Sequence, residues 1–283
     1  MQELDDYINK VKHLPPAPKV LPELLALLRR ENVDSSKVVT LMSYDPALTA
    51  DVLKSCNSAF YSPANPIVNL QDAVQWLGFK EMYRIAAAVS GAKALGPAQS
   101  GYGINTGELW HHSVATAVAS QIIAQKLGED ESVAFTAGLL HDIGKIILSE
   151  ALEKIYMKLL EETERNQQSL LDTEKKLLGV QHAEIGGRLL ARWKFPANLV
   201  SAVWFHHSPK AAQPNHRLAS MVYLGNLVAH FMGHSYGHSA LALRGRVDAL
   251  ETLNLNADQL PHFMIEAHER MAEVESMFKM AAA

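Results

Sequence analysis

Apolar residues recur every three to four positions along most of this chain, which is the spacing of a helix with one buried face. Val20, Leu24 and Leu28 share such a face, and Asp45-Pro46 marks a helix start, with aspartate as the cap and proline in the first turn. No segment alternates apolar and polar residues between turn signals, as a half-buried strand does. We therefore predict an all-α fold. Further helices are expected at about residues 70–77, 79–94, 107–127, 131–149, 151–164, 169–178, 181–193, 196–206, 216–232 and 258–279.

One stretch is rich in helix breakers, from Gly96-Pro97 to Gly101-Tyr102-Gly103. We interpret residues 96–105 as a linker between an N-terminal helical lobe (1–95) and a longer lobe (106–232), followed by a C-terminal extension (233–283). The last helix has a broad apolar face, which predicts docking on the protein's own core, with a dimer contact as the alternative. That face comprises Leu260, Phe263, Met264, Ala267, Met271, Val274 and Phe278.

Charge and cysteine content exclude several classes of protein. The 26 Lys+Arg and 30 Asp+Glu give a net charge of −4, and no basic cluster offers the counterion release that nucleic-acid binding needs. Cys56 is the single cysteine, so no intrachain disulfide is possible. The first ten residues lack the apolar region of a secretory signal, and no apolar run reaches the roughly 18 residues that span a bilayer. We expect a soluble cytoplasmic protein that binds neither nucleic acid nor membrane.

Histidine is frequent, with 13 residues, and one of them precedes an aspartate in the apolar segment 138–145. A His-Asp pair alone is a weak signal, because roughly 0.5 such pairs arise by chance in a chain of this composition. An unpaired carboxylate at Asp142, inside an apolar helix, would cost several kcal/mol, and a cation would neutralise it. The alternative for His141 is a hydrogen-bonded core histidine.

Other potential ligands accompany this pair. Glu108 and His112 are spaced i, i+4 and project to one helix face, and His182 is followed by Gly186-Gly187, which we expect to leave open space beside it. We predict one cluster of seven ligands, enough for two metal ions that share Asp142 as a bridge. The seven are Glu108, His112, His141, Asp142, His182, His206 and His207.

Several members have structural alternatives. Glu108 could be the third residue of a capping box opened by Asn105, and His111 could replace His112 as the inward residue. Either His206 or His207 could be a surface residue favoured by the helix C-terminal dipole. Glycines interrupt the run of His230, His234 and His238, which we interpret as a polar turn rather than a second metal site. We assign no function to His13, His216, His262 and His268.

Four of these motifs resemble the metal-binding motifs of the HD phosphohydrolase superfamily, in the order of its HD-GYP branch. They are His112-Ser113, His141-Asp142-Ile143-Gly144-Lys145, His182-Ala183-Glu184-Ile185-Gly186 and His206-His207. Two upstream segments, 53–61 and 67–78, resemble the HDOD family (HD-related output domain), so that the likeness covers roughly 15–230. The resemblance implies a multi-helix HD core with an N-terminal helical lobe and a role in bacterial signal transduction, usually without demonstrated catalysis.

The chain departs from the superfamily pattern twice. The position of a further metal-binding aspartate holds Asn226, which can coordinate a metal but removes one charge. Residues 208–223 contain no Gly-Tyr-Pro motif, which argues against cyclic-dinucleotide hydrolysis of the HD-GYP kind. With Asn226 counted as the eighth candidate ligand, seven of the eight positions carry the expected ligand types.

Two functions follow as hypotheses. One is a signalling module with a one- or two-ion site that binds a protein partner or a small phosphorylated ligand, with a homodimer possible. The other is a metal-dependent phosphohydrolase in which Asp142 bridges the ions and Lys145 contacts a phosphate; the alternative for Lys145 is a solvated lysine. Mixed imidazole and carboxylate ligands favour Fe, Mn, Ni or Zn. A metal-free helical scaffold with a histidine-lined ligand cavity is the third possibility.

Overall fold

The computed structural model describes residues 2–10, 20–28, 35–43, 45–58, 60–152, 169–235 and 246–282. In these ranges the chain forms helices and short 3₁₀ turns, with a single isolated β-bridge between Gln99 and Ile104 and no strand. The predicted all-α fold class is confirmed. The predicted helix at 151–164 lies almost entirely outside the described residues.

The N-terminal lobe contains α2 (Val20–Leu28), α3 (Ser35–Ser43), α4 (Pro46–Cys56) and α5 (Leu70–Leu95). Helix α4 begins as predicted, because the Asp45 carboxylate accepts a hydrogen bond from the Leu48 amide at 2.9 Å. Helix α5 is interrupted at Gly78, whose φ of 76° is a conformation that favours glycine. The break confirms the two predicted segments, 70–77 and 79–94. The remaining helix of the N-terminal region, α1 (Gln2–Lys10), packs on the other lobe against α11 and α8.

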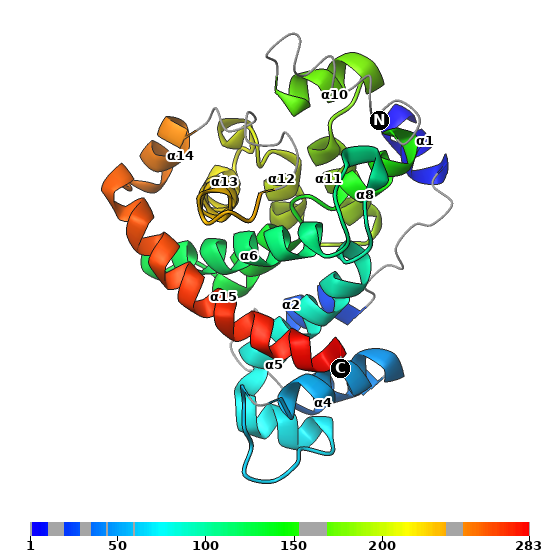
Figure 1. The fold of residues 1–283 in the computed structure, drawn as a ribbon, viewed down its shortest axis with the longest axis vertical. Helices are drawn as coiled ribbons and strands as arrows, with labels where there is room; N and C mark the ends of the chain where they lie inside the picture. Colours follow the sequence, from blue (N-terminus) through cyan, green and yellow to red (C-terminus); the bar gives the residue numbers. More distant parts are fainter. Residues whose placement is uncertain are drawn as a thin grey trace.

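Helix α6 (Glu108–Leu127) packs against both α7 (Glu131–Leu140) and α13 (His216–Phe231). Figure 1 shows α6 crossing the middle of the molecule beneath α13. Small residues bring these helices close together. A Cβ atom at Gly138 of α7 would lie 2.8 Å from Ala117 Cα, and one at Gly225 of α13 would lie 2.8 Å from the Thr116 carbonyl oxygen. Side chains larger than hydrogen at these two contacts would push the helices apart.

The predicted helix at 131–149 is wrong in one respect, because it is two helices. α7 ends at Leu140, and α8 (Gly144–Leu152) begins after a turn that contains His141 and Asp142. Gly144 packs against the His182 carbonyl so closely that a Cβ atom would lie 1.9 Å from that oxygen. This tertiary contact fixes the break. The stretch Glu131–Glu150 meets the length and hydropathy criteria for a membrane span, but it is fully buried here, as expected of core helices.

The remaining helices of the second lobe surround α6 and α8. They are α10 (Leu170–Leu178), α11 (His182–Arg192), α12 (Ala197–Trp204) and α14 (Arg246–Leu253), with 3₁₀ turns η1 (Ser100–Tyr102), η2 (Pro209–Ala211) and η4 (Ala257–Gln259). Helix α15 (Leu260–Ala282) runs diagonally across the molecule and packs on α6, α13 and α4 (Figure 1). Its buried residues include Leu260, Phe263, Ala267 and Met271, so this part of the predicted apolar face docks on the protein's own core, whereas the side chains of Val274 and Phe278 lie outside the described residues.

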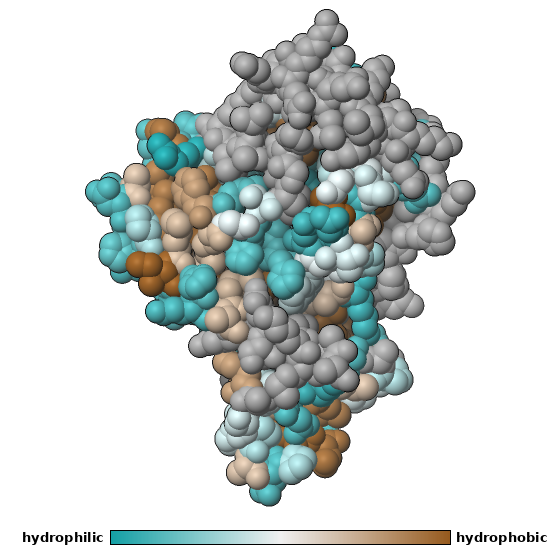
Figure 2. Space-filling model, in the orientation of Figure 1, coloured by the Kyte–Doolittle hydropathy of each residue, from teal (hydrophilic) through white to brown (hydrophobic). Residues whose placement is uncertain are grey.

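Residues 96–105, the predicted linker, lie between α5 and α6 in the chain, and their 3₁₀ turn η1 packs on α8. The Gly101 amide donates a hydrogen bond to Ser149 Oγ at 3.0 Å, and Gly101 and Tyr102 are buried. At the lower end of the molecule, Figure 2 shows hydrophilic and hydrophobic surface side by side; Phe60 and Val68, between α4 and α5, and Trp76 of α5 are exposed.

Candidate metal centre

Asp142 lies at the centre of a buried polar cluster, in the turn between α7 and α8. Its side chain is 2% exposed. Lys145, in the first turn of α8, is 3% exposed and donates a hydrogen bond from Nζ to Asp142 Oδ2 at 2.8 Å. The predicted alternative for Lys145, a solvated lysine on a helix face, is therefore wrong.

Four imidazoles direct their Nε2 atoms toward this carboxylate. His112 of α6 and His141 face Oδ2 at 3.7 and 3.3 Å. His182, the first residue of α11, and His206, just after α12, face Oδ1 at 3.1 and 3.8 Å. Each ring is at most 2% exposed. The fold thus gathers around Asp142 ligands that the sequence spreads over almost 100 residues.

The hydrogen-bond partner of Nδ1, the ring nitrogen that points away from Asp142, determines the tautomer of each ring. His141 Nδ1 lies 2.7 Å from the Gly138 carbonyl oxygen, and His206 Nδ1 lies 2.7 Å from the Val203 carbonyl oxygen. A carbonyl only accepts, so Nδ1 carries the hydrogen in both rings. Nε2 of each ring is then a lone pair directed at Asp142.

The other two rings follow the same rule. His112 Nδ1 lies 2.6 Å from the His234 carbonyl oxygen, and His182 Nδ1 lies 2.9 Å from both carboxylate oxygens of Glu174. Lone pairs that face the oxygens of Asp142 repel them, and a cation between donor and acceptor atoms removes the repulsion. Metal-binding histidines commonly donate Nδ1–H to carbonyls or carboxylates in this way.

The ligand atoms fall into two groups that share Asp142. His112, His141 and Asp142 form one group, and Asp142, His182, His206 and His207 form the other, with all ligand atoms of a group within 4.8 Å of one another. Among the described residues, His206 Nε2 and His207 Nδ1 are buried without a hydrogen-bond partner. Both groups fit a transition-metal ion, and a shared carboxylate is a common bridge in two-metal sites.

Burial and neighbouring charges hold these residues in the protonation states that metals require. Burial, reinforced by the neighbouring imidazoles, holds the pKa of His112, His206 and His207 well below the ordinary imidazole value, so these rings stay neutral. Burial would raise the pKa of Asp142, but neighbouring positive charge, including the Lys145 ammonium 2.8 Å away, holds it well below the ordinary carboxyl value. Neutral imidazoles around an ionised carboxylate are the ligand forms of a metal site.

His182 differs from these rings. Burial would lower its pKa, but the Glu174 carboxylate overcomes this effect and raises the pKa above the ordinary value. Among the ligand groups, this imidazole therefore gains its proton at a higher pH than the three whose pKa is lowered.

Glu108 is in neither ligand group. Its carboxylate accepts hydrogen bonds from the Asn105 amide at 2.7 Å and from Asn105 Nδ2 at 2.9 Å, which lowers its pKa. Only half of the predicted capping box is formed: the Glu108 carboxylate accepts from the Asn105 amide, but α6 begins at Glu108 with Gly107 as its N-cap, and the Asn105 side chain donates rather than accepts. The carboxylate lies at the partly exposed start of α6. At the next residues, the structure places His112 rather than His111 against Asp142.

Asn226 is 3% exposed, and its Oδ1 atom has no hydrogen-bond partner among the described residues. His230 lies one helical turn later on the same face of α13. The ring centroid of His230 is 5.0 Å from that of His112, and His234 accepts the hydrogen bond of His112 described above. As predicted, the chain turns at Gly233, but His230 is still within α13 and, like the His234 carbonyl, lies beside His112; His238 lies outside the described residues.

Sequence reasoning missed Glu174 and misjudged Gly186-Gly187. Glu174 precedes His182 by eight residues between polar neighbours, which is the pattern of a solvated helix face, and only the tertiary structure shows it to be buried. The two glycines border no open space. A Cβ atom at Gly187 would lie 2.7 Å from Trp204 and one at Gly186 would lie 3.3 Å from the Gly144 amide nitrogen, so they permit close packing.

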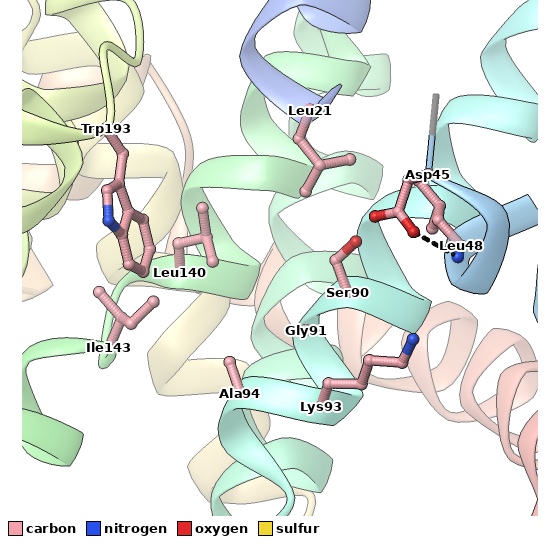
Figure 3. Close-up of a pocket in the computed structure, with 10 residues that line it drawn as sticks. All are labelled: Leu21, Asp45, Leu48, Ser90, Gly91, Lys93, Ala94, Leu140, Ile143 and Trp193. Atoms are coloured by element: carbon pink, nitrogen blue, oxygen red, sulfur yellow. Dashed lines mark hydrogen bonds between the residues drawn. The ribbon is translucent and has the colours of Figure 1, made fainter. Parts of the chain in front are cut away.

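A cavity of about 120 Å³ lies between the lobes (Figure 3). Leu21 and Leu48 line it from the N-terminal lobe, and Leu140, Ile143 and Trp193 line it from the other. Leu140 and Ile143 flank His141-Asp142 in the chain. One short stretch of chain therefore contributes both to the wall of the cavity and to the ligand cluster.

Comparison with known proteins identifies relatives. The chain is similar to an uncharacterised protein of Treponema pallidum (strain Nichols), with 28% identity over 229 residues, which are 79% of this chain and 44% of that protein. It thus spans less than half the length of this relative. A candidate phosphohydrolase from Shewanella amazonensis SB2B has a similar structure, with a TM-score of 0.73 and 25% identity over 99% of this chain and 98% of that one.

A candidate signal transduction protein from Marinobacter aquaeolei VT8 shares the fold, with a TM-score of 0.77 and 22% identity over 100% of this chain and 65% of that one. Residues 14–209, well over half of the 283, match the HDOD domain family. Together with the helical fold and the cluster around Asp142, this match shows that the chain belongs to the HDOD family.

Proposed function

We propose that this protein is a metal-binding HDOD module of bacterial signal transduction, which acts by binding a protein partner or a small phosphorylated ligand. One observation carries the metal part of the proposal. Four imidazoles whose Nδ1 atoms face hydrogen-bond acceptors direct their Nε2 lone pairs toward the two oxygens of Asp142. A pair of transition-metal ions would satisfy all of these atoms at once.

Three features favour binding over catalysis. The ligand side chains from Asp142, His112, His141 and His182 are at most 2% exposed, which leaves little ligand surface for a substrate to reach. Asn226 also stands where the superfamily pattern has an aspartate, so the site has one fewer negative charge to hold two cations. The cavity between the lobes offers a separate place for a ligand next to the turn that holds Asp142.

Hydrolysis of a phosphodiester or nucleotide is the second candidate function. The observation in its favour is the pairing of Lys145 with Asp142, which puts a buried ammonium beside the carboxylate shared by both ligand groups. A metal pair supplies a polarised phosphoryl oxygen and a hydroxide near neutral pH. Lys145 would then contribute positive charge toward a phosphate oxygen.

An activity assay separates the two functions. The protein is loaded in turn with Mn²⁺, Fe²⁺, Ni²⁺ and Zn²⁺ and assayed with bis(4-nitrophenyl) phosphate, with Asp142→Ala as the control. The proposal expects metal binding without turnover above the level of the control. Turnover in the wild type that Asp142→Ala abolishes would replace the proposal with the second candidate. Failure of every metal to bind would contradict both functions.

A further inference from the structure

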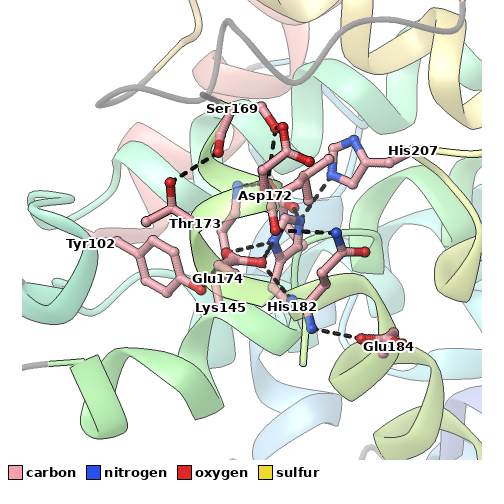
Figure 4. Close-up of polar contacts among 12 residues, drawn as sticks. Tyr102, Lys145, Ser169, Asp172, Thr173, Glu174, His182, Glu184 and His207 are labelled. Carbon is pink, nitrogen blue, oxygen red and sulfur yellow. Dashed lines mark hydrogen bonds and ion pairs between the residues drawn. The ribbon is translucent and has the colours of Figure 1, made fainter. Parts of the chain in front are cut away.

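Glu174 of α10 is fully buried and contacts the start of α11 (Figure 4). Its Oε2 atom accepts a hydrogen bond from the His182 amide at 2.9 Å, and Nδ1 of the same residue donates to the carboxylate at 2.9 Å. Tyr102 donates a third hydrogen bond, from its hydroxyl to Oε1 at 2.7 Å. Three donors therefore fix the position of this carboxylate.

The hydrogen-bond acceptor at Nδ1 of His182 differs from the acceptors of the other rings around Asp142. His112, His141 and His206 direct Nδ1 toward main-chain carbonyl oxygens, whereas His182 directs Nδ1 toward a charged side chain. A carboxylate is a stronger acceptor than a carbonyl, and, unlike a carbonyl, it can be removed by substitution.

The tautomer of His182 depends on this contact. Without Glu174, the neutral ring gains an alternative: it can carry its hydrogen on Nε2 and donate to Asp142 Oδ1, which is 3.1 Å away. A hydrogen on Nε2 occupies the lone pair that a metal needs. Glu174 removes this alternative by accepting the hydrogen on Nδ1.

We propose that Glu174 is a positioning residue for the metal site: it holds His182 in the Nδ1–H tautomer, with the Nε2 lone pair toward Asp142. Tyr102 extends the same chain of contacts to the segment that joins the lobes. The packing of residues 96–105 and the metal affinity of the His182 group are then coupled. The inference rests on the proposed metal-binding function.

Glu184 provides a matched control. It also supports the first turn of α11, because its carboxylate accepts a hydrogen bond from the Gln181 amide at 2.7 Å, and it pairs with Lys175 at 3.1 Å. Its described hydrogen bonds and ion pair go to Gln181 and Lys175 and not to the His182 ring. Loss of Glu184 weakens the helix start without changing the tautomer, and so separates positioning from simple helix stability.

The first experiment is a titration of the metal-free protein with Co²⁺, followed by the visible absorption of the bound ion. Glu174→Ala is expected to weaken Co²⁺ affinity by about 10- to 100-fold and to change the spectrum of the bound ion. Glu174→Gln retains an acceptor for Nδ1–H and is expected to recover part of the affinity. Tyr102→Phe is expected to have a smaller effect than Glu174→Ala, and Glu184→Ala none on affinity.

The second experiment does not depend on metal. The ¹⁵N chemical shifts of the His182 ring in the metal-free protein at about pH 8 report which nitrogen carries hydrogen. Wild type and Glu174→Gln are expected to carry it on Nδ1, and Glu174→Ala to shift it toward Nε2. An unchanged tautomer in Glu174→Ala, or an equal loss of Co²⁺ affinity in Glu184→Ala, would overturn the positioning role. Absence of Co²⁺ binding in the wild type would instead contradict the proposed function, while the tautomer result still tests Glu174.

Discussion

Nε2 of His182 lies 3.1 Å from Oδ1 of Asp142, and Nδ1 of the same ring faces Glu174. With hydrogen on Nδ1, the two atoms that face each other are both acceptors, and only a cation makes the contact favourable. Below the raised pKa of His182 that cation is a proton on Nε2; above it Nε2 is a lone pair that a metal ion can use.

Metal occupancy should therefore fall with pH in two stages. A metal competes with protons for each imidazole, so acidification favours release. The ion in the His182 group should be released first, as pH falls through the raised pKa of His182. The ion in the His112 group should persist to lower pH, because burial lowers the pKa of His112. Equilibrium dialysis from pH 8 to 5 measures this; occupancy that stays flat over the range would contradict it.

Asn226→Asp should affect the metal-free and metal-loaded proteins in opposite directions. Asn226 is buried, and a carboxylate there without an ion is expected to cost several kcal/mol of stability. A bound ion would offset this penalty, so the difference in Tm between loaded and metal-free protein should exceed that of the wild type. Asn226→Leu, which adds no charge, is the control. An equal Tm difference in wild type and Asn226→Asp would place Asn226 away from the metal.

Gly144→Ala should destabilise both the fold and the site. A Cβ atom at this position would lie 1.9 Å from the His182 carbonyl oxygen, so α8 and α11 would have to separate. We expect a loss of about 1–3 kcal/mol in the free energy of unfolding, together with weaker metal binding. Gly91→Ala is the matched control, since its nearest contact would be the Leu139 side chain at 3.2 Å. Denaturant unfolding measures the free energy of unfolding of both variants. Equal small losses of stability in the two would show that the close packing at Gly144 is unimportant.

Glu108→Ala should reduce stability without changing metal content. Its carboxylate accepts two hydrogen bonds from Asn105 just before α6, and loss of a hydrogen bond at a partly exposed position costs about 0.5–1.5 kcal/mol. Since neither ligand group contains Glu108, metal content should equal that of the wild type. Elemental analysis of the variant after metal loading is the measurement. A lower metal content at unchanged stability would restore Glu108 to the ligand set.

The sequence was sufficient for features that local chemistry determines. Periodicity predicted the helical class and the two segments 70–77 and 79–94 on either side of the break in α5, and Asp45-Pro46 predicted the start of α4. It was insufficient where a tertiary contact overrides a local pattern. The break between α7 and α8 depends on Gly144 meeting the His182 carbonyl from a distant helix, which no spacing within 131–149 reveals.

The same limit applies to the candidate site. The sequence was enough to predict that these histidines group around Asp142, because each lies in a recognisable local motif. Glu174 lies in a helix next to Lys175 and Lys176, where a glutamate is typical of a solvated face, and only the folded chain buries it behind His182. His230 was set apart because Gly233 ends its helix soon after, yet its ring packs near that of His112.

The metal content of the purified protein tests the central claim most directly. Wild type and Asp142→Ala are loaded with transition metal, freed of unbound ions and measured by elemental analysis. Because both ligand groups share Asp142, the account predicts one to roughly two ions per wild-type chain and almost none in the variant. A wild-type content below a few tenths of an ion per chain, or an equal content in Asp142→Ala, would contradict it.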